Sequence, residues 1–167
     1  MTNSYHATPY DLSAQGFYFE TFDEYTERAS RHRNAYGQPV EEYEIQFVDG
    51  DNYTLSAALG INQASLKLWF DVFEDYEGDQ AIKAIFLAEH QGIDISDIPD
   101  QIDDVHLFEG TAVEYAEAYL DDTGLLETIP ENLRYYFDTE AFARDLVFSG
   151  DVVEVEIEGH NFIAEAW

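Results

Sequence analysis

Carboxylate side chains recur at regular spacings in this sequence, and they are the residues best suited to act on another molecule. In the predicted strand at residues 152–158, apolar residues alternate with Glu154, Glu156 and Glu158. Alternate residues of a strand share one face at a spacing of roughly 6.6 to 7 Å, so these carboxylates are expected to form a row. A row of fixed negative charges can bind the cationic side chains of a partner.

A second acidic series lies on the predicted helix at residues 111–122. Glu114, Glu117 and Asp121 share a face that differs from the apolar stripe of that helix. Like charges at this spacing destabilise an isolated helix by roughly 0.2–0.5 kcal/mol per pair. Asp121 and Asp122 also lie at the helix C-terminus, where the macrodipole disfavours anions. The acids predicted to form a binding surface are Glu42, Glu44, Asp71, Glu74, Asp75, Glu114, Glu117, Asp121, Asp122, Glu154, Glu156 and Glu158.

The net charge of the chain restricts what such a surface can bind. Of its 167 residues, 36 are Asp or Glu and 7 are Lys or Arg, for a formal net charge of -29. This charge repels nucleic acid and anionic membrane surfaces, both of which bind basic patches. A hydrophobic content of 46% with 16% aromatic residues favours a folded chain over a disordered one. We expect a folded protein that binds neither nucleic acid nor membrane.

The absence of cysteine excludes disulfides and thiolate metal sites. The N-terminal segment lacks the basic and apolar regions of a signal peptide, and no apolar run approaches the ~18 residues of a membrane span. We therefore expect a cytoplasmic protein without a cofactor.

Three alternative classes explain the acids differently. A salt-adapted protein carries an acidic surface without a partner, and it would unfold in dilute buffer, whereas a decoy would stay folded. A calcium loop starting at Asp49 requires Gly at its sixth position and Glu at its twelfth, where this chain has Thr54 and Gly60. An enzyme is disfavoured because the histidines lie far apart and no nucleophile or phosphate-binding motif occurs. We expect no catalytic residue and no metal site.

The pattern of apolar and turn residues predicts an α+β protein built as an elongated chain of small units. The predicted units are an N-terminal α+β unit at residues 1–60, a central helical unit at 61–104, and a C-terminal α+β unit with a closing hairpin at 105–167.

The predicted N-terminal unit begins with a loose polar segment of about a dozen residues, followed by a strand at residues 16–20. Thr21 and Glu24 form a capping-box pattern that starts a helix running to about residue 34. Residues 42–49 alternate as a half-buried strand, and residues 53–55 are expected to return as another strand after a turn.

Helical spacing dominates the predicted central unit. One helix begins near Leu66 and ends before Gly78, and a second ends near Gly92. Residues 94–104 are expected to form an acidic linker. For the C-terminal unit we predict a strand at 105–108, helices at 111–122, 130–137 and 138–148, and hairpin strands at 152–158 and 162–167 joined by Gly159-His160-Asn161.

The amount of negative charge matches a length of double-stranded DNA. Duplex DNA carries one charge per ~1.7 Å of helix axis, so 29 charges correspond to roughly 15 base pairs. The charge pattern thus favours a non-enzymatic decoy that occupies the DNA-binding groove of another protein. The charge pattern alone leaves the target open among nucleic-acid-binding machines, such as a CRISPR effector or a nucleoid protein.

The segment at residues 115–151 carries a dense motif. It reads YAEAYLDDTGLLETIPENLRYYFDTEAFARDLVFSGD, in which a helix ending in Thr-Gly leads through a Leu-rich connection with a proline. An aromatic pair with Asp follows, and then an Ala-Phe-Ala-Arg-Asp-Leu stretch that closes on Ser-Gly. The segment resembles the ArdA antirestriction proteins of mobile genetic elements. Residues 17–25 and 41–45 also resemble this family, but less closely.

The resemblance implies an elongated, curved α+β dimer that mimics bent B-form DNA. It further implies that the target is the methyltransferase and specificity core of Type I restriction–modification enzymes. Two departures concern Phe17-Tyr18 and Gln46-Phe47, where the family often has a Trp and a His-Asp pair. The residues that the resemblance assigns to the dimer contact are Leu126, Tyr135, Tyr136, Phe137 and Phe142.

Overall fold

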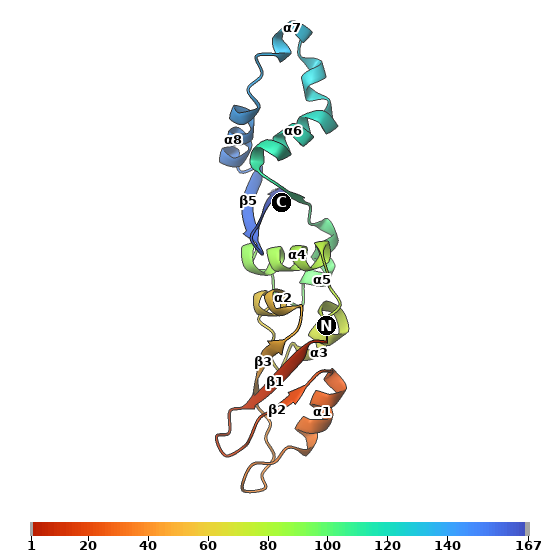
Figure 1. The fold of residues 1–167 in the computed structure, drawn as a ribbon, viewed down its shortest axis with the longest axis vertical. Helices are drawn as coiled ribbons and strands as arrows, with labels where there is room; N and C mark the ends of the chain where they lie inside the picture. Colours follow the sequence, from red (N-terminus) through yellow and green to blue (C-terminus); the bar gives the residue numbers. More distant parts are fainter. Residues whose placement is uncertain (1, 166–167) are drawn as a thin grey trace. The chain divides into compact units, whose positions relative to one another are not determined.

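The computed structural model describes residues 2–165, and its Cα positions divide the chain into two compact units at residues 1–103 and 104–167. Both units combine helices with a small antiparallel sheet, which confirms the predicted α+β class. The division of the first 104 residues into two units remains a prediction. Within the first compact unit, the N-terminal end of β1 lies beside α3 (Figure 1).

The described residues of the first unit form a sheet with the strand order β2-β1-β3. Its strands are β1 (Ser4–Pro9), β2 (Phe17–Phe19) and β3 (Tyr43–Asp49). Strand β1 is central, with Tyr5 opposite both Phe19 and Phe47. The prediction of a loose N-terminal segment is wrong, because alternate side chains of β1, including Tyr5 and Ala7, are buried. A polar N-terminal sequence can thus form a central strand when its few apolar residues repeat every second position.

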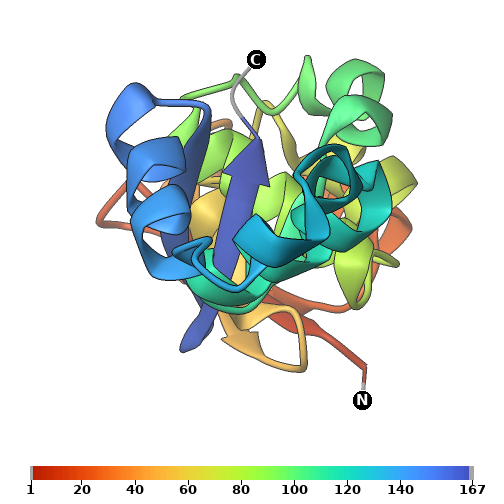
Figure 2. The same ribbon diagram turned by 90° about the horizontal axis from the view of Figure 1, so that it is seen from above.

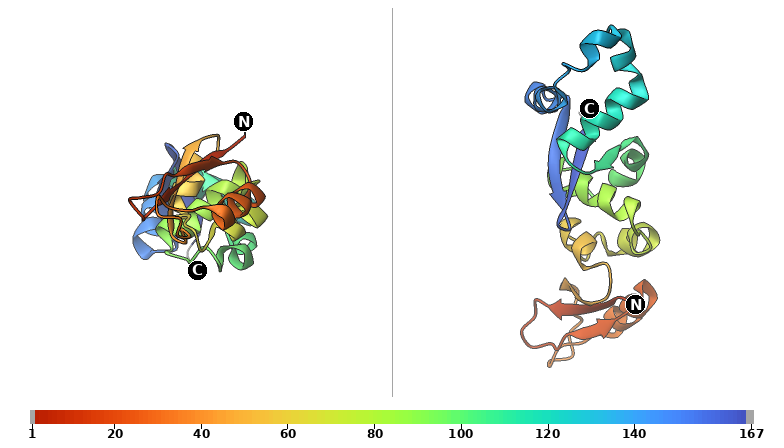
Figure 3. Two further views of the ribbon diagram at one scale, coloured as in Figure 1. Left: turned by 90° about the horizontal axis from the view of Figure 1, so that it is seen from below. Right: turned by 45° about the horizontal axis from the view of Figure 1, so that its top comes forward.

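Helix α1 (Phe22–Arg31) lies beside this sheet (Figure 3). Thr21 caps it by accepting a hydrogen bond from the N–H of Glu24, as predicted, and the Glu24 carboxylate accepts the N–H of Glu20 at 2.9 Å. The helix ends at Arg31 and not near residue 34, because His32 is in an extended conformation.

The segment after the Asp49-Gly50 turn is helical, so the strand predicted at residues 53–55 is wrong. Helix α2 (Tyr53–Ala58) buries Leu55, and Leu59 follows one turn later at 8% exposure. A spacing of four residues places both leucines on one helical face. This burial outweighs the strand preference of Tyr and Thr.

The remainder of the first unit is helical, as predicted. Its elements are α3 (Leu66–Leu68), the π-helical turn η1 (Trp69–Phe73), α4 (Asp79–Ile85), the π-helical turn η2 (Phe86–His90) and α5 (Ile98–Gln101). Residues 94–104 are not the solvated linker that we expected. Ile98 and Ile102 are buried there, on α5 and on the following 3-10 turn η3 (Ile102–Asp104), so apolar anchors tie this acidic segment to the fold.

The second unit contains a sheet with the order β4-β6-β5 over its described residues. Its elements are β4 (Leu107–Glu109), α6 (Ala112–Thr123), η4 (Leu125–Thr128), α7 (Glu131–Arg134), α8 (Thr139–Ser149), β5 (Val152–Ile157) and β6 (His160–Glu165). Helices α6 and α8 pack against each other, with the rings of Tyr119 and Phe142 6.1 Å apart. Viewed from above, the β6 arrow lies between the coils of α8 and α6 (Figure 2).

The hairpin of β5 and β6 closes more tightly than predicted. Ile157 pairs with His160, so the turn consists of Glu158 and Gly159, with φ of 54° and 81°. Positive φ at both central positions is the signature of a type I′ hairpin turn. His160 therefore belongs to β6 and not to the turn. The predicted end of the second strand, at residues 166 and 167, lies outside the described residues.

Candidate anionic binding surface

The acids of α6 are exposed to solvent. Thr111 and Glu114 form a complete capping box, in which the Glu114 carboxylate accepts the backbone N–H of Thr111 at 2.8 Å. This hydrogen bond and that of the Thr111 hydroxyl lower the pKa of Glu114. Glu117, Asp121 and Asp122 are also exposed, and no Lys or Arg of the described chain forms an ion pair with them. These carboxylates are available to a partner.

The acidic row on β5 is shorter than predicted. Glu154 and Glu156 are exposed on the strand, but Glu158 lies in the turn and leaves the row because its backbone is left-handed there. Glu154 and Glu156 line a hollow of about 270 Å³ together with Gly110 and Thr111. The fold thus brings the β5 row beside the start of α6, which the sequence pattern did not reveal.

The predicted acids of the first unit differ in their surroundings. Glu42 and Glu44 are exposed at the start of β3, and Asp75 is exposed beyond η1. Asp71 is also exposed, but it forms an ion pair with Lys67 one helical turn earlier. Part of the charge of this unit is therefore neutralised within the fold.

Glu74 is partly buried and interacts with the interior of the first unit. Its Oε1 accepts hydrogen bonds from the Tyr5 hydroxyl at 3.0 Å and from Asn3 Nδ2 at 3.4 Å. The Tyr5 oxygen accepts the indole N–H of Trp69 at 2.7 Å, and Asn52 donates to the backbone carbonyl of Glu74. Burial raises the pKa of Glu74 above its usual range. Its carboxylate therefore holds together segments of the fold, unlike the other eleven acids, which are exposed.

Most Lys and Arg side chains with a described contact bind other groups of the same chain and so stabilise the fold. Arg31 pairs with Glu27 at 2.8 Å on α1, and Lys83 pairs with Asp79 at 3.0 Å on α4. Arg134 donates instead to two backbone carbonyls around the η4 turn. Residues 104–167 contain 16 Asp and Glu against two Arg and no Lys. The second unit therefore keeps nearly all of its negative charge.

The aromatic residues assigned to a dimer contact fall into two groups. Tyr135 and Tyr136 follow α7 and are 90% and 77% exposed. Phe137 and Phe142 are half-buried against each other, with ring centroids 5.7 Å apart, and Leu126 is also half-buried. The tyrosines thus offer contact area to another molecule, and the phenylalanines hold the tyrosine-bearing segment against α8.

Phe148 is a further exposed aromatic residue that the sequence pattern did not identify. It lies near the end of α8 and is 86% exposed, and Leu133 on α7 is 50% exposed. At 100° per residue, Phe148 lies about 240° around the helix from Phe142. This offset places Phe148 on a different face of α8 from the packed residue Phe142. The helical periodicity of the sequence could therefore have predicted that Phe148 is exposed.

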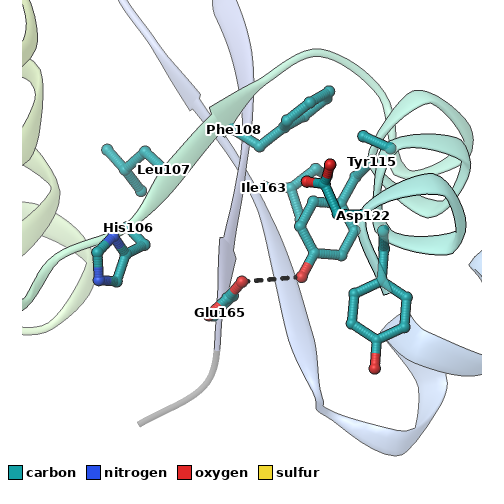
Figure 4. Close-up of a pocket in the computed structure, with 9 residues that line it drawn as sticks. His106, Leu107, Phe108, Tyr115, Asp122, Ile163 and Glu165 are labelled. Carbon is teal, nitrogen blue, oxygen red and sulfur yellow. Dashed lines mark hydrogen bonds between the residues drawn. The ribbon is translucent and has the colours of Figure 1, made fainter. Parts of the chain in front are cut away.

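A pocket between α6 and the sheet of the second unit is lined by residues that lie far apart in the sequence. Tyr115 donates a hydrogen bond to Glu165 Oε1 at 3.0 Å, and burial raises the pKa of Tyr115 to about 12 (Figure 4). These two residues are fifty positions apart, so no local pattern links them. The pocket is lined by His106, Leu107, Phe108, Tyr115, Ala118, Tyr119, Asp122, Ile163 and Glu165.

Metal-binding clusters and membrane-spanning helices are both absent from residues 2–165. That part of the chain contains no cluster of three or more His, Asp or Glu side chains placed to hold a metal ion. None of its helices combines the length and the apolar character needed to cross a membrane.

The fold and the surface define a class of acidic α+β protein that displays carboxylates and exposed aromatic rings. A model of the ArdA family of antirestriction proteins matches residues 7–160. The chain belongs to this family, which confirms the resemblance found in the sequence, and its function is antirestriction. No curated protein matches the sequence significantly.

Proposed function

We propose that this chain prevents restriction by occupying the DNA-binding groove of Type I restriction–modification enzymes in place of DNA. The observation that carries the proposal is a set of exposed acids in the second unit that form no ion pair with a Lys or Arg of residues 2–165, above all Glu117, Asp121, Glu154 and Glu156. Such carboxylates can occupy the positions of phosphates against the Lys and Arg side chains of the groove. The complementary electrostatic fields of the acidic surface and the basic groove would also accelerate the association of the two proteins.

Inhibition of DNA cleavage by a purified Type I enzyme tests this proposal. The test variant is Glu154→Gln with Glu156→Gln, and the matched control is Glu27→Gln with Asp79→Asn. Both variants remove two negative charges, but the control acids already pair with Arg31 and Lys83.

The test variant is expected to weaken inhibition roughly 10-fold at about 0.1 M salt and to reduce its salt dependence, since each lost ionic contact lowers the salt slope. The control is expected to change inhibition less than 2-fold, because paired surface charges contribute little. Equal effects of the two variants would show that total charge matters and not this surface. If the wild-type chain bound a different nucleic-acid-binding protein in a lysate and bound no Type I enzyme, that protein would be the target instead.

We also propose that the chain forms a homodimer through the exposed aromatic residues of the second unit. Tyr135 and Tyr136 present large apolar areas to solvent, and aromatic residues are enriched in protein interfaces. A dimer would double the roughly 15 base pairs of DNA to which one chain corresponds. Sedimentation of Tyr135→Ser with Tyr136→Ser should show monomers at concentrations where the wild type dimerises, whereas Tyr18→Ser, exposed in the first unit, should leave the dimer intact.

A further inference from the structure

The pocket between α6 and the sheet of the second unit has the size of a single side chain. Its volume is about 270 Å³, which is below the range of roughly 300–1,000 Å³ typical of small-molecule and cofactor sites. Three aromatic residues and two acids contribute to its lining (Figure 4). The composition therefore suits a small cationic group.

The two acids of this pocket are able to accept further hydrogen bonds. Glu165 uses Oε1 to accept the hydroxyl of Tyr115 at 3.0 Å, and a carboxylate has about four acceptor positions on its two oxygens. Asp122 lies in the last turn of α6, where the partial negative charge of the helix terminus disfavours an anion. No Lys or Arg within residues 2–165 forms an ion pair with either acid. A cation entering the pocket would relieve the unfavourable charge of Asp122 and would bind the remaining acceptor positions of Glu165.

The aromatic rings of the pocket form a continuous group. Tyr115 and Tyr119 are stacked with ring centroids 6.2 Å apart, and Phe108 meets Tyr115 edge-on at 5.6 Å. Tyr119 is 39% exposed, so part of its surface is open to a partner. The faces of such rings attract cations, and guanidinium groups also stack on them.

We propose that this pocket receives one arginine side chain of the target protein, held by Asp122 and Glu165 and stacked against Tyr119. This inference rests on the proposed function and identifies one specific contact within it. Arginine suits the site better than lysine because its planar fork can donate to two carboxylates while its face lies on a ring. The pocket would thereby add a fixed anchor to an otherwise diffuse electrostatic interaction.

The neighbouring residues Asp121 and Asp122 provide a matched test. Both are exposed in the last turn of α6, but only Asp122 lines the pocket. Asp122→Asn and Asp121→Asn remove the same charge, so inhibition of a Type I enzyme is compared at about 0.3 M salt, where diffuse interactions are screened. Asp122→Asn is expected to weaken inhibition roughly 10-fold, since it removes a hydrogen bond to a charged group. Asp121 also belongs to the proposed binding surface, so Asp121→Asn should weaken inhibition, but only about 2-fold at this salt, because it loses a diffuse interaction that salt screens.

A second variant probes the ring without changing the charge. Tyr119→Leu is expected to weaken inhibition about 2- to 5-fold, the range of a partly exposed cation–π contact. Thermal unfolding of each variant separates loss of binding from loss of fold. Equal inhibition by the Asp121 and Asp122 variants, with wild-type activity intact, would overturn the arginine site and leave the proposed function standing.

A direct titration distinguishes failure of the pocket from failure of the proposed function. Methylguanidinium is added to the full chain, and the NMR signals of the Tyr115 and Tyr119 rings are followed. Saturable shifts in the wild type and in Asp121→Asn, but not in Asp122→Asn, would support the site even if no Type I enzyme were inhibited. Shifts that are absent, or equal in all three proteins, would overturn it.

Discussion

The two units of this chain differ in where their aromatic and charged residues lie. In the first unit, Tyr5, Phe19 and Trp69 are fully buried, and the Tyr5 hydroxyl links Trp69 to Glu74. In the second unit, the most exposed aromatic side chains are Tyr135 at 90% and Phe148 at 86%, among the residues described. The core of the first unit is thus built around large rings, although Tyr36 of that unit is also 81% exposed, whereas the buried residues of the second unit are mainly aliphatic.

The charged residues of the two units also differ in their ion pairs. Three Lys or Arg side chains of the first unit form ion pairs with acids one turn away, at Glu27, Asp71 and Asp79. In the described part of the second unit, the corresponding pair is His160 with Glu109, which is ionic only when the histidine is protonated. Among the described residues, the Lys and Arg ion pairs that stabilise the fold therefore lie in the first unit.

The largest expected effect comes from the core of the first unit. Trp69→Ala should lower the free energy of unfolding by about 3–5 kcal/mol, because it leaves a cavity and removes the indole donor to Tyr5. Urea unfolding measures the change. Tyr135→Ala in the second unit should change the stability of the monomer by less than about 0.5 kcal/mol. Similar losses for both variants would contradict the contrast between the units.

A smaller loss is expected from one hydroxyl group. Tyr5→Phe keeps the ring but leaves the Trp69 N–H and the Glu74 carboxylate without their shared partner. The expected cost is about 1–3 kcal/mol, the penalty of an unsatisfied buried polar group. The control is Tyr18→Phe on the neighbouring strand, where the side chain is 60% exposed. An equally small effect of both changes in urea unfolding would show that the buried hydroxyl does not stabilise the unit.

The hairpin turn of the second unit offers a gain of stability. Glu158 adopts a φ of 54°, a conformation that costs most residues roughly 1–2 kcal/mol and that Asn tolerates better. Glu158→Asn should raise the free energy of unfolding by about 1 kcal/mol. Glu158→Gln removes the same charge without relieving the backbone, so it should give a smaller gain. If the two variants were equally stabilised, repulsion between charges would be the cause and not the turn.

The smallest expected effect is a change in the pH dependence of stability when Glu74 is replaced. Because burial raises the pKa of this carboxyl in the folded state, the folded chain holds its proton more tightly than the unfolded chain does. Its contribution to stability is present at low pH and is lost as the pH rises from about 4.5 through the raised folded value.

Glu74→Gln should therefore lose less stability than the wild type between pH 4 and pH 7. Denaturant unfolding at both pH values measures this difference. Glu77→Gln, at an exposed position in the same segment, should retain the wild-type slope. An unchanged slope for Glu74→Gln would show that the carboxyl is not desolvated in solution.

Local patterns predicted much of the secondary structure. Thr21 and Glu24 predicted the start of α1, and the alternation of residues 152–158 predicted the strand β5. These predictions succeeded because capping and two-residue periodicity depend on neighbours in the sequence. The same local reasoning failed at residues 53–55, where burial of Leu55 and Leu59 on one helical face outweighed strand propensity.

The excess of acids, the family motif at residues 115–151 and the α+β class follow from the order of residues alone. The role of each acid depends on the packing of distant segments. Glu74 meets Tyr5 across 69 positions, and Glu165 meets Tyr115 across 50, so neither contact leaves a local signature. The physical reason is that the charge of a carboxylate belongs to its residue type, whereas its hydration and its hydrogen-bond donors depend on which distant segments pack beside it.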